Sequence, residues 1–333
     1  MSKIKELGEF GLIHRLTSKL KFQASNSILG IGDDCAVYPV KSGSKEVIST
    51  DALVEGIHFN LSTTTPEELG RKALSVSLSD IAAMGGAPKR VLVTLGISKK
   101  ISVPFLDKLY AGFNTICKRF NVELAGGDTV SSPNSFFINV AIIGEANRVF
   151  TRRGAKPGDL IFVTGTLGDS SLGLKFLSKK TKRSKDHNFL VGRHLDPTPR
   201  VQEAHILARS RINITSMIDI SDGLAQDLHH ICKASSVGAR IQESQLPQSP
   251  EFSRTCNRNK INPLPFLLNG GEDYELLFTL PSDGVKNLKR QFLKAKALVT
   301  QIGEITLKPK KVSLEKSDGR NIFLPESEGF NHF

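Results

Sequence analysis

GIGDDC, residues Gly30–Cys35, places two adjacent carboxylates, Asp33 and Asp34, directly behind a pair of glycines that flank Ile31. Glycine lets the backbone turn tightly and approach a ligand closely. Two neighbouring carboxylates repel each other unless a cation lies between them. This stretch therefore predicts a turn that presents carboxylates to a cation.

Further acidic stretches of similar composition follow along the chain. Each pairs aspartate with small or hydroxyl residues: Ser49-Thr50-Asp51, Ser79-Asp80, Gly126-Gly127-Asp128 and Asp219-Ile220-Ser221-Asp222. Oxygen-rich sets of this kind suit hard cations such as magnesium, which usually works beside phosphates. Any one stretch alone is typical of a turn. Because five occur in one chain, several beside apolar strand-like runs, they favour a shared metal site.

Length and composition indicate an ordinary globular protein. The chain has 333 residues, of which 39% are hydrophobic and 23% charged, so it is long enough for two domains with substantial cores. The chain has no apolar run of ~18 residues, so no membrane span is predicted. The N-terminus lacks the features of a secretory signal. The four cysteines are scattered without a CxxC pair, which predicts free thiols in a reducing cytoplasm.

The net charge of +12 raises the question of nucleic-acid binding. Basic clusters occur at residues 179–185 and 308–311. Neither has interleaved aromatic residues, and no nucleic-acid motif is present. We therefore interpret them as solvated surface, which would also steer anionic nucleotides toward a site, and we expect neither nucleic acid nor membrane as a partner.

The first half of the chain predicts an α+β sheet with helices on one face. Helical spacing is found at residues 5–20, 66–86 and 103–119, and strand patterns at 46–59, 89–97, 121–125 and 135–144. Asp80 falls among apolar neighbours in the second helix, and a buried aspartate needs a partner or a cation. A turn-rich KPGD segment near residues 148–158 predicts a boundary between domains 1–148 and 149–333.

The second half predicts an α/β domain. Strands are expected at residues 159–165, 213–220, 238–242 and 275–280, with helices between them, and residues 245–262 look irregular. Ser221 and Asp222 precede a predicted helix that begins at Gly223, so Asp222 is either a metal ligand or a plain N-cap.

Taken in order, the motifs resemble a known family. They are GIGDDCAV, STDALVEGIHF, SLSDIAAMGG, AGGDT, TRRGAKPGD, VTGTLGDSSLGL, DISDGL, GGEDYEL and the terminal GFNHF. Together they resemble the thiamine-monophosphate kinase family over nearly the whole chain. SLSDIAAMGG and DISDGL are shared with the wider superfamily of aminoimidazole-ribonucleotide synthetase and selenophosphate synthetase.

The resemblance implies a fold and a reaction. It implies an N-terminal α+β domain whose sheet pairs with that of a second subunit in a barrel-like homodimer, and a C-terminal α/β domain packed against it. The implied reaction is in-line transfer of the ATP γ-phosphate to thiamine monophosphate, the last step of thiamine diphosphate biosynthesis, with several Mg²⁺ ions.

The chemistry agrees with that reaction. Divalent ions are needed to bring two polyanions together. A phosphate monoester has its second pKa near ~6, so the attacking oxygen is already largely anionic at neutral pH. Catalysis can then depend on positioning and charge neutralisation, with no covalent nucleophile and no general base.

The resemblance also assigns roles to individual positions. Metal ligands are expected at Asp34, Ser49, Thr50, Asp51, Asp80, Asp128, Asp219 and Asp222, while Asp33 either holds the turn or adds a ligand. ATP contacts are expected at Tyr110, Gly127, Asp128, Arg152 and Ser221. Substrate contacts are expected at His58, Glu272 and Phe330, where Phe330 can stack on a ring and Glu272 can face the cationic thiamine.

Alternatives stay open for some residues and for the function. His58 fits a satisfied core histidine, Thr50 a strand residue, and Phe330 a docked tail. Another ATP-dependent synthetase of the superfamily is possible, although selenophosphate synthetase usually carries a reactive cysteine near the N-terminus and no cysteine precedes Cys35 here. A non-catalytic protein that binds thiamine phosphates or nucleic acid is the remaining alternative.

Overall fold

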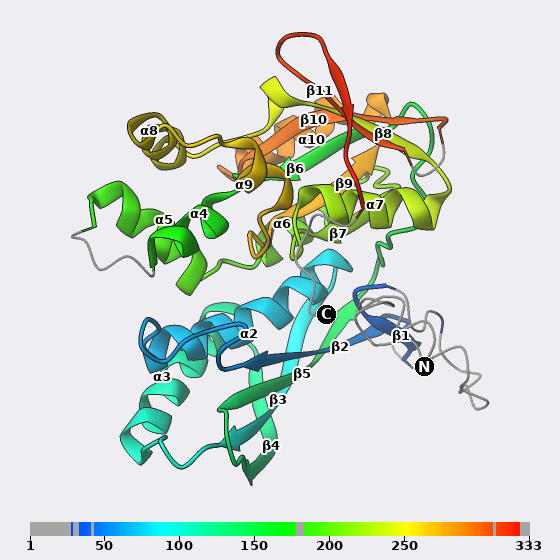
Figure 1. Cartoon of the computed structure of the whole chain (residues 1–333). Coiled ribbons are helices and arrows are strands. Elements are labelled where there is room, and N and C mark those ends of the chain that lie inside the picture. The colour runs from blue at the N-terminus through cyan, green and yellow to red at the C-terminus, as the bar shows by residue number, and fades with distance from the viewer. Residues whose placement is uncertain (1–27, 29–32, 41–42, 178–182, 309–310, 327–333) are drawn as a thin grey trace, which may run out of the picture.

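A computed structural model describes residues 28, 33–40, 43–177, 183–308 and 311–326. The helix predicted at residues 5–20 lies outside these ranges. The described chain forms two α/β domains, each built on its own sheet and stacked one above the other in Figure 1. This arrangement confirms the predicted fold class of two mixed α/β domains.

The N-terminal domain contains a five-stranded sheet in the order β1-β2-β5-β3-β4. Neighbouring strands are antiparallel except for the parallel pair β3 and β4. Its elements are β1 (Ala36–Pro39), β2 (Lys45–Val54), α2 (Pro66–Ala83), β3 (Ala87–Ile97), α3 (Val103–Phe120), β4 (Glu123–Ser131) and β5 (Phe137–Ala146).

Helix α2 has a start that the local sequence dictates. Thr65 is the N-cap, and its side chain accepts a hydrogen bond from the backbone N–H of Glu68 while the Glu68 carboxylate accepts one from the backbone N–H of Thr65. Pro66 occupies the first turn, where no donor is required. The chain leaves the helix through Gly85, whose φ of 72° suits glycine.

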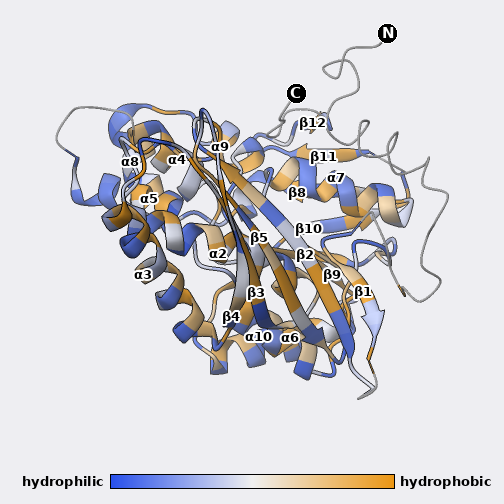
Figure 2. Ribbon diagram, turned by 90° about the horizontal axis from the view of Figure 1, so that it is seen from below, coloured by the Kyte–Doolittle hydropathy of each residue, from blue (hydrophilic) through white to orange (hydrophobic). Residues whose placement is uncertain are grey.

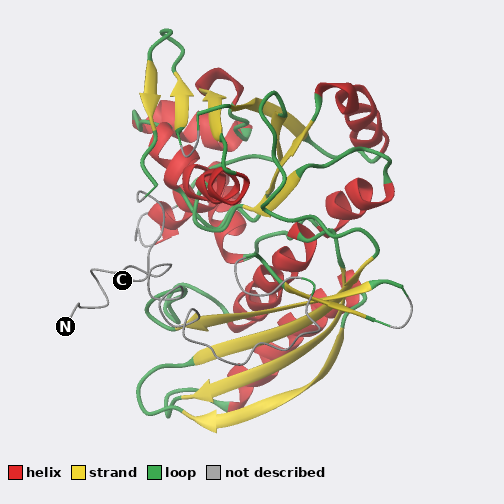
Figure 3. Ribbon diagram, turned by 90° about the vertical axis from the view of Figure 1, so that its right-hand side faces the viewer, coloured by secondary structure: helices red, strands yellow, loops and turns green. Residues whose placement is uncertain are grey.

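The two faces of the N-terminal sheet differ. On β3, Val91, Val93 and Leu95 are buried against the helices, and α2 packs on β2, β3 and β5. Leu92 on the opposite face is 43% exposed, and Val130 on β4 is 42% exposed. In Figure 3 the described helices lie on one side of this sheet, and Figure 2 views the sheet from below, where apolar residues run along β5.

The C-terminal domain is built on a seven-stranded sheet in the order β12-β11-β8-β10-β6-β9-β7. Its elements are β6 (Leu160–Thr164), α4 (Asp169–Leu177), α5 (Lys185–Leu195), α6 (Val201–Arg209), β7 (Ser216–Asp219), α7 (Leu224–Ser235), β8 (Gly238–Gln242), η1 (Glu243–Gln245), α8 (Pro250–Asn259), α9 (Leu264–Asn269), β9 (Leu276–Leu280), η2 (Ser282–Gly284), α10 (Val285–Lys294), β10 (Val299–Thr306), β11 (Val312–Glu315) and β12 (Asn321–Phe323).

Alternating side chains of this sheet enter two different cores. On β6, Phe162 joins the core that contains residues of α6, α10 and the N-terminal domain. Its neighbours Ile161 and Val163 join the core that contains residues of α4, α5, α7 and α8. Successive side chains of a strand point to opposite faces of the sheet, and here helices cover both of these faces.

Helix α2 connects the domains. It contacts α6 and β7 of the C-terminal domain as well as its own sheet. The Ser79 hydroxyl donates to Asp219 at 2.6 Å, and Arg71 pairs with Asp196 at 2.8 Å. Helix α2 is thereby held against the other domain.

Two local predictions were wrong, and one alternative is excluded. The strand expected to run through residue 59 ends at Val54, because Gly56 turns the chain at a φ of 84°. The segment expected to be irregular contains α8, which begins after the N-cap Ser249 and buries Phe252, although its composition is mostly polar. The N-cap of α7 is Gly223, which excludes the alternative that Asp222 is a plain N-cap.

Within the described residues, no helix is long and apolar enough to cross a membrane.

Candidate active site

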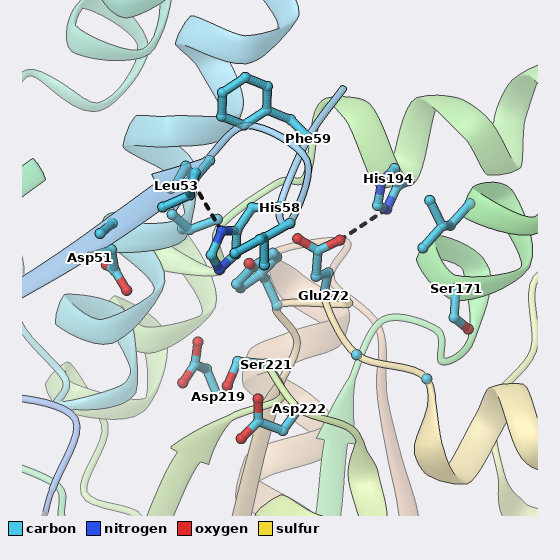
Figure 4. A pocket seen from close by; sticks show the side chains of 18 of the residues that line it. Asp51, Leu53, His58, Phe59, Ser171, His194, Asp219, Ser221, Asp222 and Glu272 are labelled. Carbon is cyan, nitrogen blue, oxygen red and sulfur yellow. Dashed lines mark hydrogen bonds and ion pairs between the residues drawn. The ribbon is translucent and has the colours of Figure 1, made fainter. Parts of the chain in front are cut away.

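A cavity of about 1000 Å³ lies between the two domains. The N-terminal domain lines it with the end of β2, the turn that follows and helix α2. The C-terminal domain contributes Arg152, parts of α4 and α5, the turn after β7, the first turns of α7 and the segment 269–274. Figure 4 shows Asp219, Ser221 and Asp222 on one side of this pocket and Glu272 with His194 on another.

Carboxylates from three separate segments meet at one end of the cavity. Oxygens of Asp34, Asp80 and Asp219 all lie within 4.8 Å of one another. Asp80 accepts a hydrogen bond from the Ser49 hydroxyl, and Asp219 accepts one from Ser79. The structure therefore brings together acidic stretches that are far apart in the sequence.

A second group lies at the start of α7. Atoms of Asp222, Asp227 and His230 lie within 4.8 Å of one another. Asp227 accepts hydrogen bonds from the backbone N–H groups of Gly223 and Asp222, at 3.1 and 3.2 Å, and so holds the turn that precedes the helix. Asp222 accepts a hydrogen bond from Gln226 at 2.9 Å.

At the acidic end of the cavity, where Asp34, Asp80 and Asp219 meet, the carboxylates repel one another, and a bound cation would reduce this repulsion. Burial, and then the neighbouring charge of Asp34, raises the pKa of Asp219 to about 7. The same two causes raise the pKa of Asp33 to about 6. Burial also raises the pKa of Asp51 and, together with the charge of Asp51, that of Asp80. The carboxylates resist ionisation together because too little positive charge offsets them.

The donor set fits a hard cation. One buried oxygen of Asp34 and one of Asp51 have no hydrogen-bond partner in the described structure. A buried polar atom without a partner is costly and calls for an ion or water. Carboxylate and hydroxyl oxygens are the ligands that magnesium prefers.

Arg152 supplies a cation at the edge of this cluster. Its Nη2 lies 2.6 Å from an Asp34 oxygen, and its backbone N–H donates to Asp33 at 3.1 Å. Burial would lower the pKa of Arg152, but Asp34 and Asp33 raise it above its usual value. Asp33 thus joins the start of the C-terminal half to the acidic turn.

Glu272 forms a second centre in a different part of the wall. Its Oε1 lies 2.8 Å from Lys72 Nζ, and its Oε2 lies 3.0 Å from His194 Nδ1. Burial alone would raise the pKa of Glu272, but Lys72 and His194 lower it to about 2. Burial and Lys72 lower the pKa of His194, so this ring is neutral near pH 7. Glu272 is therefore an ionised carboxylate whose charge is already paired.

His58 lines the cavity rather than the core. Its Nδ1 accepts a hydrogen bond from the backbone N–H of Val54 at 3.0 Å. The neutral ring then carries its proton on Nε2. The turn after β2 therefore fixes both the position and the tautomer of this histidine (Figure 4).

Most of the positions expected to form the site are found at the cavity. Those in its wall are Thr50, Asp51, His58, Asp80, Arg152, Asp219, Ser221, Asp222 and Glu272. Asp33, Asp34 and Ser49 join them through the hydrogen bonds and ion pairs given above.

Three expected positions lie elsewhere in the chain. Tyr110 is on α3, where it is 42% exposed and packs edge-on against Phe113. Gly127 and Asp128 are exposed on β4, at the edge of the N-terminal sheet. None of the three lines the cavity within one chain. Phe330 lies outside the described residues.

The sequence reasoning missed Lys72, His194 and Asp227. Lys72 had a signal: it is three residues after Leu69 and four before Val76, so it lies on the apolar stripe of α2 where a lysine needs a buried partner. Asp227 had the same signal, since it lies three residues after Leu224 and four before Ile231 on α7. His194 had none, because a histidine in the last turn of a helix is ordinary.

Family models match both domains. Residues 32–146 match the model described as AIR synthase related protein, N-terminal domain, and residues 156–314 match the corresponding C-terminal domain. The first match falls on the N-terminal domain and the second on the C-terminal domain.

Named relatives match over nearly their full length. A thiamine-monophosphate kinase of Bacillus subtilis (strain 168) is 37% identical, with 98% of this chain and all of the relative covered. One of Escherichia coli (strain K12) is 38% identical, with 98% of each chain covered.

Solved structures agree with these relatives. The structure of AaThiL complexed with AMPPCP and TMP superposes with a TM-score of 0.87 at 35% identity, covering 100% of this chain and 99% of that one. Thiamine monophosphate kinase from Aquifex aeolicus superposes with a TM-score of 0.80 at 33% identity, covering 96% and 99%. The chain therefore belongs to the thiamine-monophosphate kinase family of AIR synthase related proteins.

Proposed function

We propose that the protein transfers the γ-phosphate of ATP to thiamine monophosphate, giving thiamine diphosphate and ADP. The observation that carries this proposal is the convergence of carboxylates from both domains at one end of a cavity large enough for two substrates. Relatives named thiamine-monophosphate kinase, and a relative solved with AMPPCP and TMP, support it.

The acidic end is where magnesium would be held. The residues for this role are Asp34, Ser49, Thr50, Asp51, Asp80, Asp219 and Asp222, with Asp33 as a further ligand or as the holder of the turn. Bound Mg²⁺ supplies positive charge that offsets the phosphates of both substrates. Arg152 presents a planar set of donors beside the cluster, and Ser221 presents a hydroxyl, so both suit contacts to ATP phosphates.

The reaction needs no general base from the protein. The attacking phosphate oxygen of thiamine monophosphate is largely anionic at neutral pH, since its second pKa is near ~6. The protein's contribution is to align that oxygen with the γ-phosphorus and to surround the transferring group with positive charge.

The opposite wall would recognise the thiamine portion of the substrate. His58 and Glu272 line the cavity there, and Phe330 completes the set by the family pattern. Leu53 and Val76 in the same lining add apolar surface for a heterocycle.

Tyr110, Gly127 and Asp128 point to a homodimer. They lie away from the cavity of their own chain, on α3 and on the edge strand β4. The open sheet face beside them carries exposed apolar residues such as Leu92 and Val130. We propose that this face pairs with a second copy in a barrel-like dimer, and that these three positions complete the ATP and metal site of the partner subunit.

The two domains would then have different roles. We propose that residues 1–148 form the ATP-binding, metal-binding and dimerisation domain and that 149–333 complete the site. We also propose a cytoplasmic location, because all four cysteines are free thiols.

The test is an assay with purified protein, ATP, Mg²⁺ and thiamine monophosphate, in which thiamine diphosphate is followed by chromatography. Product should form only with a divalent cation. Unphosphorylated thiamine should be a poor acceptor, because its hydroxyl, unlike the phosphate oxygen of thiamine monophosphate, is not ionised at neutral pH. Efficient phosphorylation of free thiamine, or no product from thiamine monophosphate, would overturn the proposal.

A further inference from the structure

Lys72 is a buried lysine at the boundary between the domains. It lies on α2, it is 1% exposed, and it ranks among the largest fully buried side chains of the described chain. A lysine is almost never fully buried unless its charge is paired. Its Nζ lies 2.8 Å from Glu272 Oε1 and 3.5 Å from the backbone carbonyl of His58. Lys72 therefore touches both described residues of the proposed substrate wall.

Glu272 is held from several directions. Its backbone has a φ of 64°, which is unusual for a residue other than glycine. Its N–H donates to the Ser221 carbonyl at 2.8 Å, and its second carboxylate oxygen contacts His194 on α5 at 3.0 Å. Strained backbone of this kind persists only where the surroundings fix it. Lys72 reaches Glu272 from the N-terminal domain.

We propose that Lys72 is a positioning residue that cancels the charge of Glu272 and fixes the direction of its carboxylate at the cavity wall. The inference rests on the proposed function, which places Glu272 on the substrate side. Lys72, Glu272 and a neutral His194 together carry no net charge. Glu272 then recognises the substrate as an oriented hydrogen-bond acceptor and not as a free counter-ion for a cation.

The first test is thermal unfolding of Lys72→Met, Glu272→Gln and the double variant at about pH 6 and about pH 9, without substrate. The groups that face Glu272 are Lys72 from α2, His194 from α5 and Tyr274 from its own segment. In the wild type, Glu272 stays ionised over this range because its pKa is about 2, so the pair contributes equally at both pH values.

The two single variants should differ in their pH dependence. Lys72→Met leaves a buried negative charge that a proton on Glu272 or His194 can replace, so its loss of Tm should be larger at about pH 9 than at about pH 6. Glu272→Gln removes the carboxylate itself, so its loss of Tm should not rise between about pH 6 and about pH 9. The double variant should have the same loss of Tm at both pH values.

Arg71→Met is the matched control. It removes a neighbouring ion pair of α2 with the C-terminal domain, Arg71 to Asp196, which lies outside the cavity lining. Its loss of Tm should not change between the two pH values. Equal losses at both pH values for Lys72→Met would overturn the pairing, and so would a loss for Glu272→Gln that rises with pH as strongly as that of Lys72→Met.

The second test separates positioning from stability. At about pH 8, Lys72→Met should raise KM for thiamine monophosphate by roughly tenfold, as expected for a misplaced charged hydrogen bond, and leave KM for ATP within about twofold. Arg71→Met should change neither constant. An unchanged KM for thiamine monophosphate in an active Lys72→Met protein would overturn the positioning role of Lys72 but not the proposed function. Absence of turnover in the wild type would overturn the proposed function and, with it, the substrate role of Glu272.

Discussion

The pKa values of the carboxylates at the two ends of the cavity are shifted in opposite directions. At the acidic end, Asp34, Asp80 and Asp219 crowd together, and the pKa of Asp219 rises to about 7. At the other end, Lys72 and His194 surround Glu272, and its pKa falls to about 2. Burial acts to raise the pKa at both ends, so the difference lies in the positive charge that the protein itself provides.

This difference indicates which end depends on its ligands. The acidic end lacks sufficient positive charge within the described chain and is stable as an ionised cluster only with added cations. The Glu272 end is complete before any ligand binds. On the proposed function, the substrate-binding end is preorganised, whereas the phosphate-binding end needs added cations.

The largest expected effect comes from removing a carboxylate at the acidic end. Asp51→Asn should lower kcat by about 10²–10³-fold, since a preorganised charge contact to the transferring group is lost. Asp128→Asn should do the same if the partner subunit supplies that residue. Steady-state kinetics at saturating Mg²⁺ measures both.

Asp283→Asn is the control, because Asp283 is exposed in η2 and does not line the cavity. Its kcat should stay within about twofold of the wild type, as expected for a surface substitution. Near-normal turnover by Asp51→Asn at saturating Mg²⁺ would show that the shared metal site is wrong.

The acidic end should also make stability depend on pH and on metal. The folded pKa values of Asp219 and Asp33, about 7 and about 6, are above those of an unfolded chain. Protons therefore stabilise the metal-free fold, and Tm should fall as the pH rises from about 5 to about 8. Mg²⁺ should restore Tm by on the order of 2–5 °C at about pH 8 and by less at about pH 5, where protons compete.

Differential scanning fluorimetry with chelator or with Mg²⁺ measures these shifts. In Asp219→Asn both the pH dependence and the response to Mg²⁺ should be smaller. A Tm that is independent of pH in the chelated wild type would contradict the view that the acidic end is short of positive charge.

The acidic end could be predicted from the sequence, and the Glu272 end only in part. Each aspartate at the acidic end lies within two residues of a glycine or a hydroxyl residue, so the local pattern marks it as a candidate ligand. The structure then had only to bring these segments together. Lys72 and His194 are distant in sequence from Glu272. Their pairing depends on how α2 and α5 pack, which no local pattern encodes.

The fold shows the same limit. Strands β8 and β9 were predicted within a residue, because short apolar runs between turns are strong signals. Helix α8 was missed because its buried face is narrow and most of its residues are polar. The distance of Tyr110 and Asp128 from the cavity could not be foreseen, since it depends on tertiary and quaternary structure.

The preorganised end gives a smaller and more selective effect. Glu272→Gln should raise KM for thiamine monophosphate by about tenfold, because hydrogen bonds to charged groups contribute roughly 1.5–3 kcal/mol. KM for ATP should stay nearly unchanged, since Glu272 lies apart from the acidic end. Kinetics with each substrate varied in turn measures this selectivity, and equal loss of both affinities would contradict the division between the two ends.

The smallest expected effect concerns Phe330, which lies outside the described residues and is assigned to the substrate side by the family pattern alone. Chain ends are disordered by default, but the terminal GFNHF is aromatic and carries a glycine, unlike a solvated tail. Stacking on a ring is worth roughly 0.5–1.5 kcal/mol beyond burial, with a further gain if a cationic ring lies near. Phe330→Ala should therefore raise KM for thiamine monophosphate by about two- to tenfold and leave KM for ATP unchanged. Phe333→Ala, three residues further on, is the control for loss of an aromatic tail residue and should have little effect. If Phe330→Ala weakens both substrates equally, or lowers Tm with no change in either KM, the tail is structural and the substrate wall consists of His58 and Glu272 without it.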